Sequence, residues 1–345
     1  MNKARKGYLD IAKAFGIIIV LINHIGLGLA GANRYFGAFY VSEFFFLAGM
    51  TFRVKEQESA RDFVKKKAKR LVLPYLGYSL FYLLWFSLRT GLAGNLTVRE
   101  LIYKLLGCVY ARNYLFFHRE EKLYLMEIMN APMWFLPSLF VGLCIYYGLY
   151  RTLGEKRGYG VLMCMAAGLV LHYVSPVLLP WSIDTGLLMQ PLLFAGERLN
   201  QIDYIAVTRK KLWILPMILL TFYLLVTFNG AGNISVGDYG VSVALFLLSS
   251  GLGTFLCIMV SYYIERYLHF LGKVLMIIGE NTLDILCLHL FVFAMAQTFF
   301  GMVGIDASQP MTQMMTVLAG LVLPIGVGLG NGWMQKKYKN IGQEK

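Results

Sequence analysis

The sequence is poor in charge and lacks the cysteine and histidine patterns of redox and metal proteins. Only 15% of its 345 residues are charged, whereas soluble domains average about 25%. Its five cysteines form no CxxC pair, and its histidines show no HxxH or HExxH spacing. We therefore expect no disulfide scaffold, no metal site and no bound cofactor. The low charge also excludes a water-soluble enzyme.

The sequence instead contains a series of long apolar segments. It is 58% hydrophobic, with a mean hydropathy of +0.60. Runs of about 20 apolar residues have the length of a membrane-spanning helix, and their continuity argues against a membrane β-barrel. We predict an all-α polytopic membrane protein of about ten transmembrane helices, forming a single domain over residues 1–345. The predicted segments are 9–30, 36–52, 71–90, 133–151, 158–176, 181–196, 212–229, 240–262, 275–300 and 312–332.

The distribution of basic residues predicts the orientation of these helices. An even number of helices places both termini on one side of the membrane, and lysine and arginine mark the cytoplasmic side. Of the 32 basic residues, 25 fall on the segments predicted to be cytoplasmic. The net charge of +13 thus reflects membrane orientation, and no nucleic-acid partner is expected. The first segment is similar to a signal peptide, but Asp10 and Lys13 interrupt it, so we expect it to stay as a helix.

Polar side chains inside apolar segments are candidate functional residues, because a bilayer makes them costly. The first segment holds Asp10, Lys13 and His24. Lys13 and His24 are eleven residues apart, which on a helix is about 16 Å along the axis and nearly the same face. Histidine is the most frequent general base near neutral pH, so we predict that His24 is a base. The alternative is a structural hydrogen bond to a neighbouring helix.

Further polar residues lie in the second and ninth segments. Glu43 is suited to orient His24 or to neutralise Lys13, but a structural ion pair explains it equally well. The ninth segment contains Asn281, Thr282 and His289, which we predict to face the protein interior rather than lipid. For His289 alone, a packing role is the stronger interpretation.

A basic run precedes the third segment. Most of its charges serve as a topology anchor, but the same cations suit cytoplasmic phosphates. Lys67 and Arg70 are three residues apart, on one face if the run is helical. This arrangement is suited to a nucleotide-derived donor such as coenzyme A.

Five motifs in order resemble the acyltransferase 3 family of integral membrane O-acyltransferases. They are the Lys13-(ten residues)-His24 pair, Phe-Phe-Phe-Leu-Ala-Gly at 44–49, Lys67 and Arg70 before Pro74, Trp134-Phe135-Leu136, and the stretch 279–289. The stretches 229–230 and 238–240 look similar to the fucose-type sugar O-acetylase branch. Lysine stands at positions 13 and 67 where the family more often has arginine, which removes bidentate phosphate contacts there.

The resemblance implies transfer of an acyl group, usually acetyl from cytoplasmic acetyl-CoA, to a hydroxyl of a cell-envelope polysaccharide or lipid-linked sugar. It also implies a multi-pass protein of the cell membrane, and we expect this to be the inner membrane of a bacterium. No serine or cysteine stands out beside His24 as a nucleophile, which favours direct transfer over a covalent acyl-enzyme. The residues implied are His24 and Glu43 for catalysis, Lys13, Lys67 and Arg70 for acyl-CoA, and Asp10, Trp134, Asn281, Thr282 and His289 for the pore lining.

Two other classes of function remain. A transporter or flippase for a lipid-linked glycan or small solute would also need polar groups within its helices, although no inverted repeat of broken helices is evident. A structural membrane subunit explains the polar groups less well. Whether the chain forms a homodimer stays open.

Overall fold

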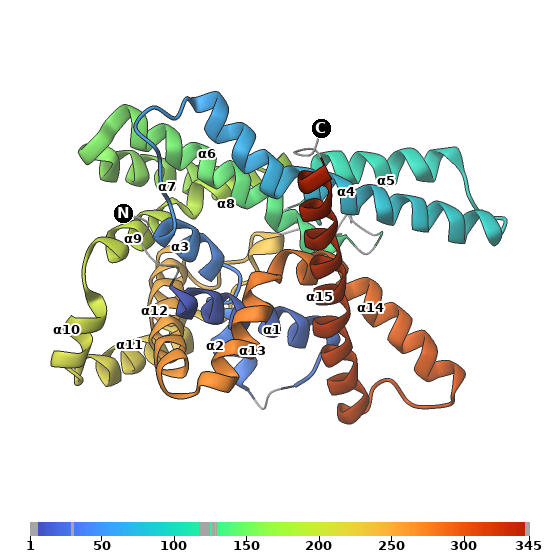
Figure 1. The fold of residues 1–345 in the computed structure, drawn as a ribbon. Coiled ribbons are helices and arrows are strands. Elements are labelled where there is room, and N and C mark those ends of the chain that lie inside the picture. Colours follow the sequence, from blue (N-terminus) through green and yellow to red (C-terminus); the bar gives the residue numbers. More distant parts are fainter. Residues whose placement is uncertain (1–5, 29–30, 117–124, 126–127, 129, 342–345) are drawn as a thin grey trace. The chain divides into compact units, whose positions relative to one another are not determined.

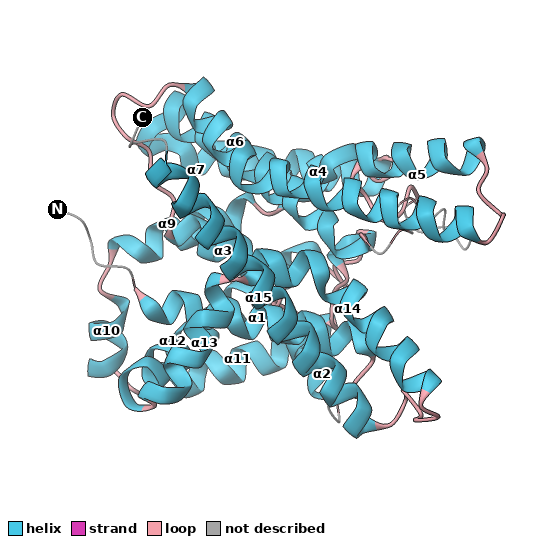
Figure 2. Ribbon diagram, turned by 45° about the vertical axis from the view of Figure 1, so that its right-hand side comes forward, coloured by secondary structure: helices cyan, strands magenta, loops and turns pink. Residues whose placement is uncertain are grey.

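The computed structural model describes residues 6–28, 31–116, 125, 128 and 130–341. Within these ranges the regular structure is helical and contains no strand (Figure 2), apart from two isolated bridges. The all-α prediction is thus confirmed. The chain divides into two compact units, with residues 1–33 and 257–345 in unit 1 and residues 34–256 in unit 2. A single domain stays a prediction.

Six stretches of the described chain are long and apolar enough to cross a membrane, which makes this a multi-pass membrane protein. The number rises to seven if α10 (Tyr204–Lys210) and α11 (Ile214–Asn229), bent by 103°, form one crossing. The predicted number of about ten is not confirmed. One of the six stretches contains both α6 (Phe135–Leu153) and α7 (Arg157–Val174), of 19 and 18 residues. Each has about the length of one crossing.

Three predicted segments are broken rather than continuous. Segment 36–52 contains part of α2 (Ala32–Gly37) and α3 (Glu43–Met50). Segment 181–196 contains α8 (Ile183–Leu188) and most of α9 (Gln190–Gln201), where Pro191 lacks the N–H that a continuous helix needs. Segment 275–300 is divided at Asn281 between α13 (His269–Glu280) and α14 (Thr282–Met302). Helices of 6 to 12 residues are too short to span a bilayer alone.

Unit 1 is built around α1 (Gly7–Ile25), which packs against α13, α14 and α15 (Pro310–Ile341). The carboxylate of Glu265, near the end of α12 (Val243–Tyr267), accepts a hydrogen bond of 3.1 Å from the Tyr8 backbone N–H. A negative charge is favourable there because the N-terminus of a helix carries positive partial charge. Gly279 lets α13 approach α1 closely, since a Cβ at this position would collide with the backbone carbonyl of Asp10.

Unit 2 contains most of the remaining helices, and α12 crosses from unit 2 into unit 1 at residue 257. Its α3 packs against α9, and α4 (Ala60–Leu92) packs against α6. The helix α5 (Val98–Tyr110) lies beside α4, as Figure 1 shows. Ser59 caps α4 by accepting a hydrogen bond from the Asp62 N–H, which places the start of this helix ahead of the basic run. The short 3-10 helices are Ala131–Trp134, Gly154–Lys156, Pro180–Ser182 and Ile234–Val236.

Candidate functional site

The last turn of α1 and the first half of α14 bring two histidines together in unit 1. The Nδ1 of His24 lies 2.9 Å from the Nε2 of His289. The two rings stack with their centroids 5.0 Å apart. The Nδ1 of His289 lies 2.9 Å from the carbonyl oxygen of Ile285, one turn earlier in α14. His289 is fully buried, whereas His24 is exposed.

These contacts determine which nitrogen of each neutral ring carries a hydrogen. A carbonyl oxygen only accepts, so the Nδ1 of His289 donates to Ile285 and its Nε2 is the accepting nitrogen. The Nδ1 of His24 must then donate to that Nε2. The Nε2 of His24 is left with a lone pair, on a ring that is exposed. This is the form that a general base requires, and protonation of His24 would strengthen its hydrogen bond to His289.

Sequence reasoning selected both histidines but did not foresee that they pair. They are 265 positions apart, and no spacing in the sequence connects them. The predicted partner of His24 was Glu43, which lies at the start of α3 in unit 2 and is fully buried. Its role toward His24 stays a prediction. Within unit 1, the Nδ1 of His24 is bonded to His289.

The opposite end of α1 holds an ion pair. The Nζ of Lys13 lies 2.9 Å from the Oδ1 of Asp10, and 30% of the lysine side chain is exposed whereas that of Asp10 is buried. Asp10 thus neutralises the lysine, and the exposed part of Lys13 remains accessible to a second anionic group. His24 follows Lys13 by about three helical turns, on nearly the same face.

The break between α13 and α14 is the second polar region of unit 1. The Asn281 side chain donates to the Ile277 carbonyl at 2.7 Å, and Thr282 is the first residue of α14. A Cβ at Gly328 of α15 would lie 2.6 Å from a carboxylate oxygen of Asp284 and 2.8 Å from the amide oxygen of Asn281. This polar break therefore packs against α15, and a place for Asn281 and Thr282 in the lining of a pore stays a prediction.

In unit 2, the basic run at the start of α4 contains paired and unpaired cations. The Nζ of Lys66 lies 3.1 Å from a carboxylate oxygen of Glu58. Burial raises the pKa of Glu58, but hydrogen bonds from Lys66 and from the Lys55 N–H, with the charges of both lysines, outweigh it and leave the pKa below its usual value. In contrast, Lys67 and Arg70 form no ion pair among the described residues; the Lys67 ammonium lies over the Phe63 ring, 5.3 Å from its centroid. Arg70 is exposed.

Trp134, the remaining predicted residue, also lies in unit 2. It ends the 3-10 helix before α6 and is buried, with 4% of its surface exposed. The guanidinium of Arg112 lies over its ring at 5.5 Å from the centroid. The structure thus assigns Trp134 and the basic run to one unit and the two histidines to the other.

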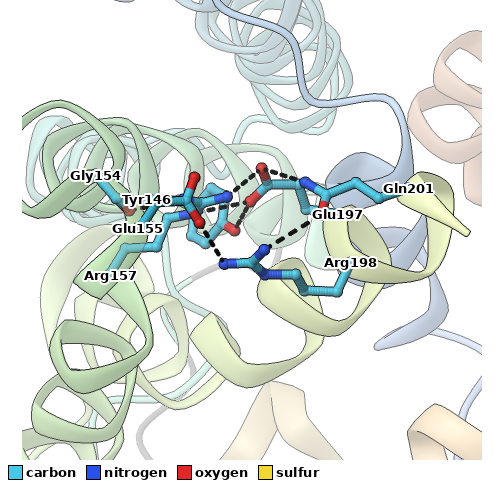
Figure 3. Close-up of polar contacts among 7 residues, drawn as sticks. All are labelled: Tyr146, Gly154, Glu155, Arg157, Glu197, Arg198 and Gln201. Atoms are coloured by element: carbon cyan, nitrogen blue, oxygen red, sulfur yellow. Dashed lines mark hydrogen bonds and ion pairs between the residues drawn. The ribbon is translucent and has the colours of Figure 1, made fainter.

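A polar network at the junction of α6 and α7 was not predicted. The Nε and Nη2 of Arg157 donate to the two carboxylate oxygens of Glu197, at 3.1 and 2.8 Å (Figure 3). The Tyr146 hydroxyl donates to the same carboxylate, and the Nη1 of Arg157 donates to the Gly154 carbonyl at 2.6 Å. All three guanidinium nitrogens and both carboxylate oxygens therefore have partners. The sequence offered one signal, charged residues at the ends of apolar segments, but this signal does not distinguish a buried pair from a topology anchor.

Comparisons with known proteins agree with the earlier resemblance at the level of the family. The model of the acyltransferase 3 family, described as an acyltransferase domain, matches residues 6–330. The match covers both units and all the candidate residues. Among curated proteins and among solved structures, no match was found. Within the described residues, no three His, Cys, Asp or Glu side chains are grouped so that they could hold a metal ion.

Proposed function

The chain belongs to the acyltransferase 3 family, and we propose that it transfers an acetyl group from cytoplasmic acetyl-CoA to a hydroxyl of a cell-envelope polysaccharide or lipid-linked sugar. The observation that carries the proposal is the His24–His289 pair. It leaves the Nε2 of an exposed histidine free to take a proton. Removing a hydroxyl proton is the task that O-acylation sets, because a neutral hydroxyl is a weak nucleophile.

The proposed reaction is a direct transfer. The Nε2 of His24 takes the proton of the acceptor hydroxyl as its oxygen attacks the thioester carbonyl carbon. The bond between this carbon and sulfur breaks, an O-acetyl ester forms, and the coenzyme A thiolate leaves with the proton from His24. His289 holds the His24 ring in the required tautomer and stabilises its charged form through the shared hydrogen bond.

The proposed donor site uses Lys67 and Arg70, which form no ion pair among the described residues, and Lys13, which is paired with Asp10. Lys67 and Arg70 are three residues apart on α4, and Lys13 keeps part of its side chain exposed. Each is suited to a phosphate of coenzyme A. The excess of basic residues on the predicted inner segments supports a cytoplasmic donor side, with both termini in the cytoplasm and the protein in the cell membrane, in a bacterium the inner membrane. The similarity of 238–240 to the fucose-type branch supports a sugar acceptor.

The proposal is tested by measuring alkali-released acetate from surface glycans of cells that lack the gene. These cells are complemented with the natural protein, with His24→Ala or with His269→Ala, and membrane levels of the three proteins are matched. His269 is an exposed histidine at the start of α13 and serves as the control. We expect His24→Ala to lose about 100-fold to 10,000-fold of the transfer, the usual contribution of a general base, and His269→Ala to keep it.

Restoration of acetate by His24→Ala would remove His24 as the base. If no complemented strain differs from the deletion strain, acetyl transfer to the envelope is wrong. Turnover of labelled acyl-CoA by membranes would then separate a different acyl group from the transporter interpretation.

A further inference from the structure

A second buried polar cluster lies in unit 2, and the proposed reaction does not use it. Arg112 is fully buried; its Nη2 lies 3.0 Å from the Oδ2 of Asp184, and its Nη1 donates to the Thr185 hydroxyl at 3.0 Å. Ser182 lies two residues before Asp184. Tyr239, from the loop before α12, has its hydroxyl close to that of Thr185. We call Arg112, Ser182, Asp184 and Tyr239 the Arg112 cluster.

The Arg112 cluster contains four buried polar atoms that make no hydrogen bond of normal geometry in the described part of the chain. They are the Nε of Arg112, the Oδ1 of Asp184, the hydroxyl of Ser182 and the hydroxyl of Tyr239. Each of the four residues is at most 2% exposed. Buried polar groups nearly always have a partner. These atoms are close in space at Arg112, Asp184 and Tyr239, and Ser182 is close to Asp184 in sequence, so their lack of well-formed hydrogen bonds indicates a missing ligand. The Arg157–Glu197 network is also buried, and its described side chains include no such atom.

Backbone strain is concentrated at the same place. Among the described residues, three that are not glycine have left-handed φ angles, namely Ala111 at 58°, Trp181 at 55° and Ser182 at 53°. Ala111 directly precedes Arg112, and the other two precede Asp184. The Trp181 indole N–H donates to the Val109 carbonyl at 3.0 Å and so holds the two strained segments together. Strain of this kind persists where the surroundings impose it, and it clusters at ligand sites.

We infer that the Arg112 cluster binds a hydroxyl-rich compound, and we assign to it the sugar of the acceptor. Asp184 already balances the charge of Arg112, so an anionic ligand would gain little. The atoms without a well-formed hydrogen bond in the described part of the chain are N–H and O–H donors beside a carboxylate acceptor. A sugar hydroxyl both donates and accepts, so one hydroxyl can accept from the Arg112 Nε–H and donate to the Asp184 Oδ1. This inference rests on the proposed function, which supplies the sugar.

The four atoms are inaccessible in the structure, so a sugar reaches them only after the covering residues move. Unpaired buried polar groups disfavour the closed arrangement. A bound sugar would form hydrogen bonds with these polar groups and would so favour the arrangement in which the covering residues have moved. Sugar affinity should therefore depend on single hydroxyl groups that make no hydrogen bond of normal geometry within the described part of the chain.

Tyr239→Phe is the decisive variant, because it removes one such hydroxyl and leaves the ring. Methyl glycosides of fucose, glucose and galactose serve as acceptors for the protein in detergent with acetyl-CoA. We expect the KM for the best glycoside to rise about tenfold, the effect of one lost hydrogen bond. The kcat and the KM for acetyl-CoA should stay nearly unchanged. The control is Thr254→Val, which removes another buried hydroxyl without a hydrogen-bond partner, from α12.

An unchanged glycoside KM in Tyr239→Phe would overturn the inference, since the hydroxyl would then have no ligand role. An equal rise in Thr254→Val would overturn it too, because the effect would not be specific to the Arg112 cluster. Both results leave the proposed function intact as long as the natural protein acetylates a glycoside.

A binding measurement separates the inference from the chemistry. The thermal midpoint of the His24→Ala protein, which we expect to be inactive, is followed with increasing glycoside, and a saturable rise is expected. The rise should be lost when Tyr239→Phe is added and kept when Thr254→Val is added. No saturable rise with any of the three glycosides would overturn the assignment of a sugar. A rise without transfer by the natural protein would contradict the proposed function alone.

Discussion

Two polar pairs, one in each unit, differ in whether each of their nitrogen and oxygen atoms has a hydrogen-bond partner. In unit 2 the Arg157–Glu197 pair is closed, since every guanidinium nitrogen and both carboxylate oxygens have a partner (Figure 3). In unit 1 the His24–His289 pair is open, because three of its four ring nitrogens are used and the Nε2 of His24 has no partner among the described residues. A network in which every such atom is bonded stabilises the fold. A pair with an unbonded nitrogen can also bind or deprotonate a reacting molecule.

This difference predicts a large change in stability at the closed pair. Glu197→Ala leaves the buried Arg157 charge without its carboxylate, so the free energy of unfolding should fall by about 3–5 kcal/mol. The thermal midpoint in detergent measures the loss. The matched control is Glu155→Ala, which removes an 89%-exposed carboxylate of the same network, 3.9 Å from Arg157 and 3.6 Å from Arg198. An exposed pair contributes about 0–1 kcal/mol, so the control should melt close to the natural protein.

Transfer per folded molecule should survive in Glu197→Ala. A variant that melts normally but has lost transfer would show that the closed network takes part in the reaction, and the comparison between closed and open pairs would fail.

The sequence predicted helices and individual polar residues, but not the contacts between distant residues. The apolar segments predicted helices, and the broken ones carried local signals, such as Pro191 in α9 and Gly279 before Asn281. Both histidines were found because a polar residue in an apolar segment is conspicuous on its own. Their pairing could not be predicted, because it depends on how α1 packs against α14. The role of Gly279 in the close contact of α1 with α13 is likewise visible only in the structure. The closed pair was missed for the same reason, because Arg157 and Glu197 look like any charged residues at segment ends.

The open pair predicts a smaller effect, on activity rather than on stability. His289→Phe keeps a ring in the α14 position but removes the nitrogen that accepts from His24, so the His24 tautomer is no longer fixed. We expect kcat to fall about tenfold to a hundredfold, less than for loss of the base itself. His289→Gln is the rescue variant, since its amide oxygen can accept the same hydrogen bond and should restore most of the rate.

A purely structural role for His289 gives a different result. Both variants would then lose thermal stability in proportion to their loss of rate, and glutamine, which is polar and buried, would perform no better than phenylalanine.

The smallest expected effect is on the KM for acetyl-CoA. It comes from the basic run of α4, which contains both a paired cation and cations without an ion pair among the described residues. Lys66 forms an ion pair with Glu58, whereas Lys67 and Arg70 form no ion pair among the described residues. Lys67→Met and Arg70→Met should each raise the KM for acetyl-CoA about threefold to tenfold, the usual effect of one charge-assisted contact with phosphate, with kcat little changed. Lys69→Met is the matched control, because Lys69 is about 200° around the helix from Lys67 and its removal changes the net charge equally. If Lys69→Met raises the KM as much, the run attracts the donor only by its overall charge, and Lys67 and Arg70 form no phosphate site.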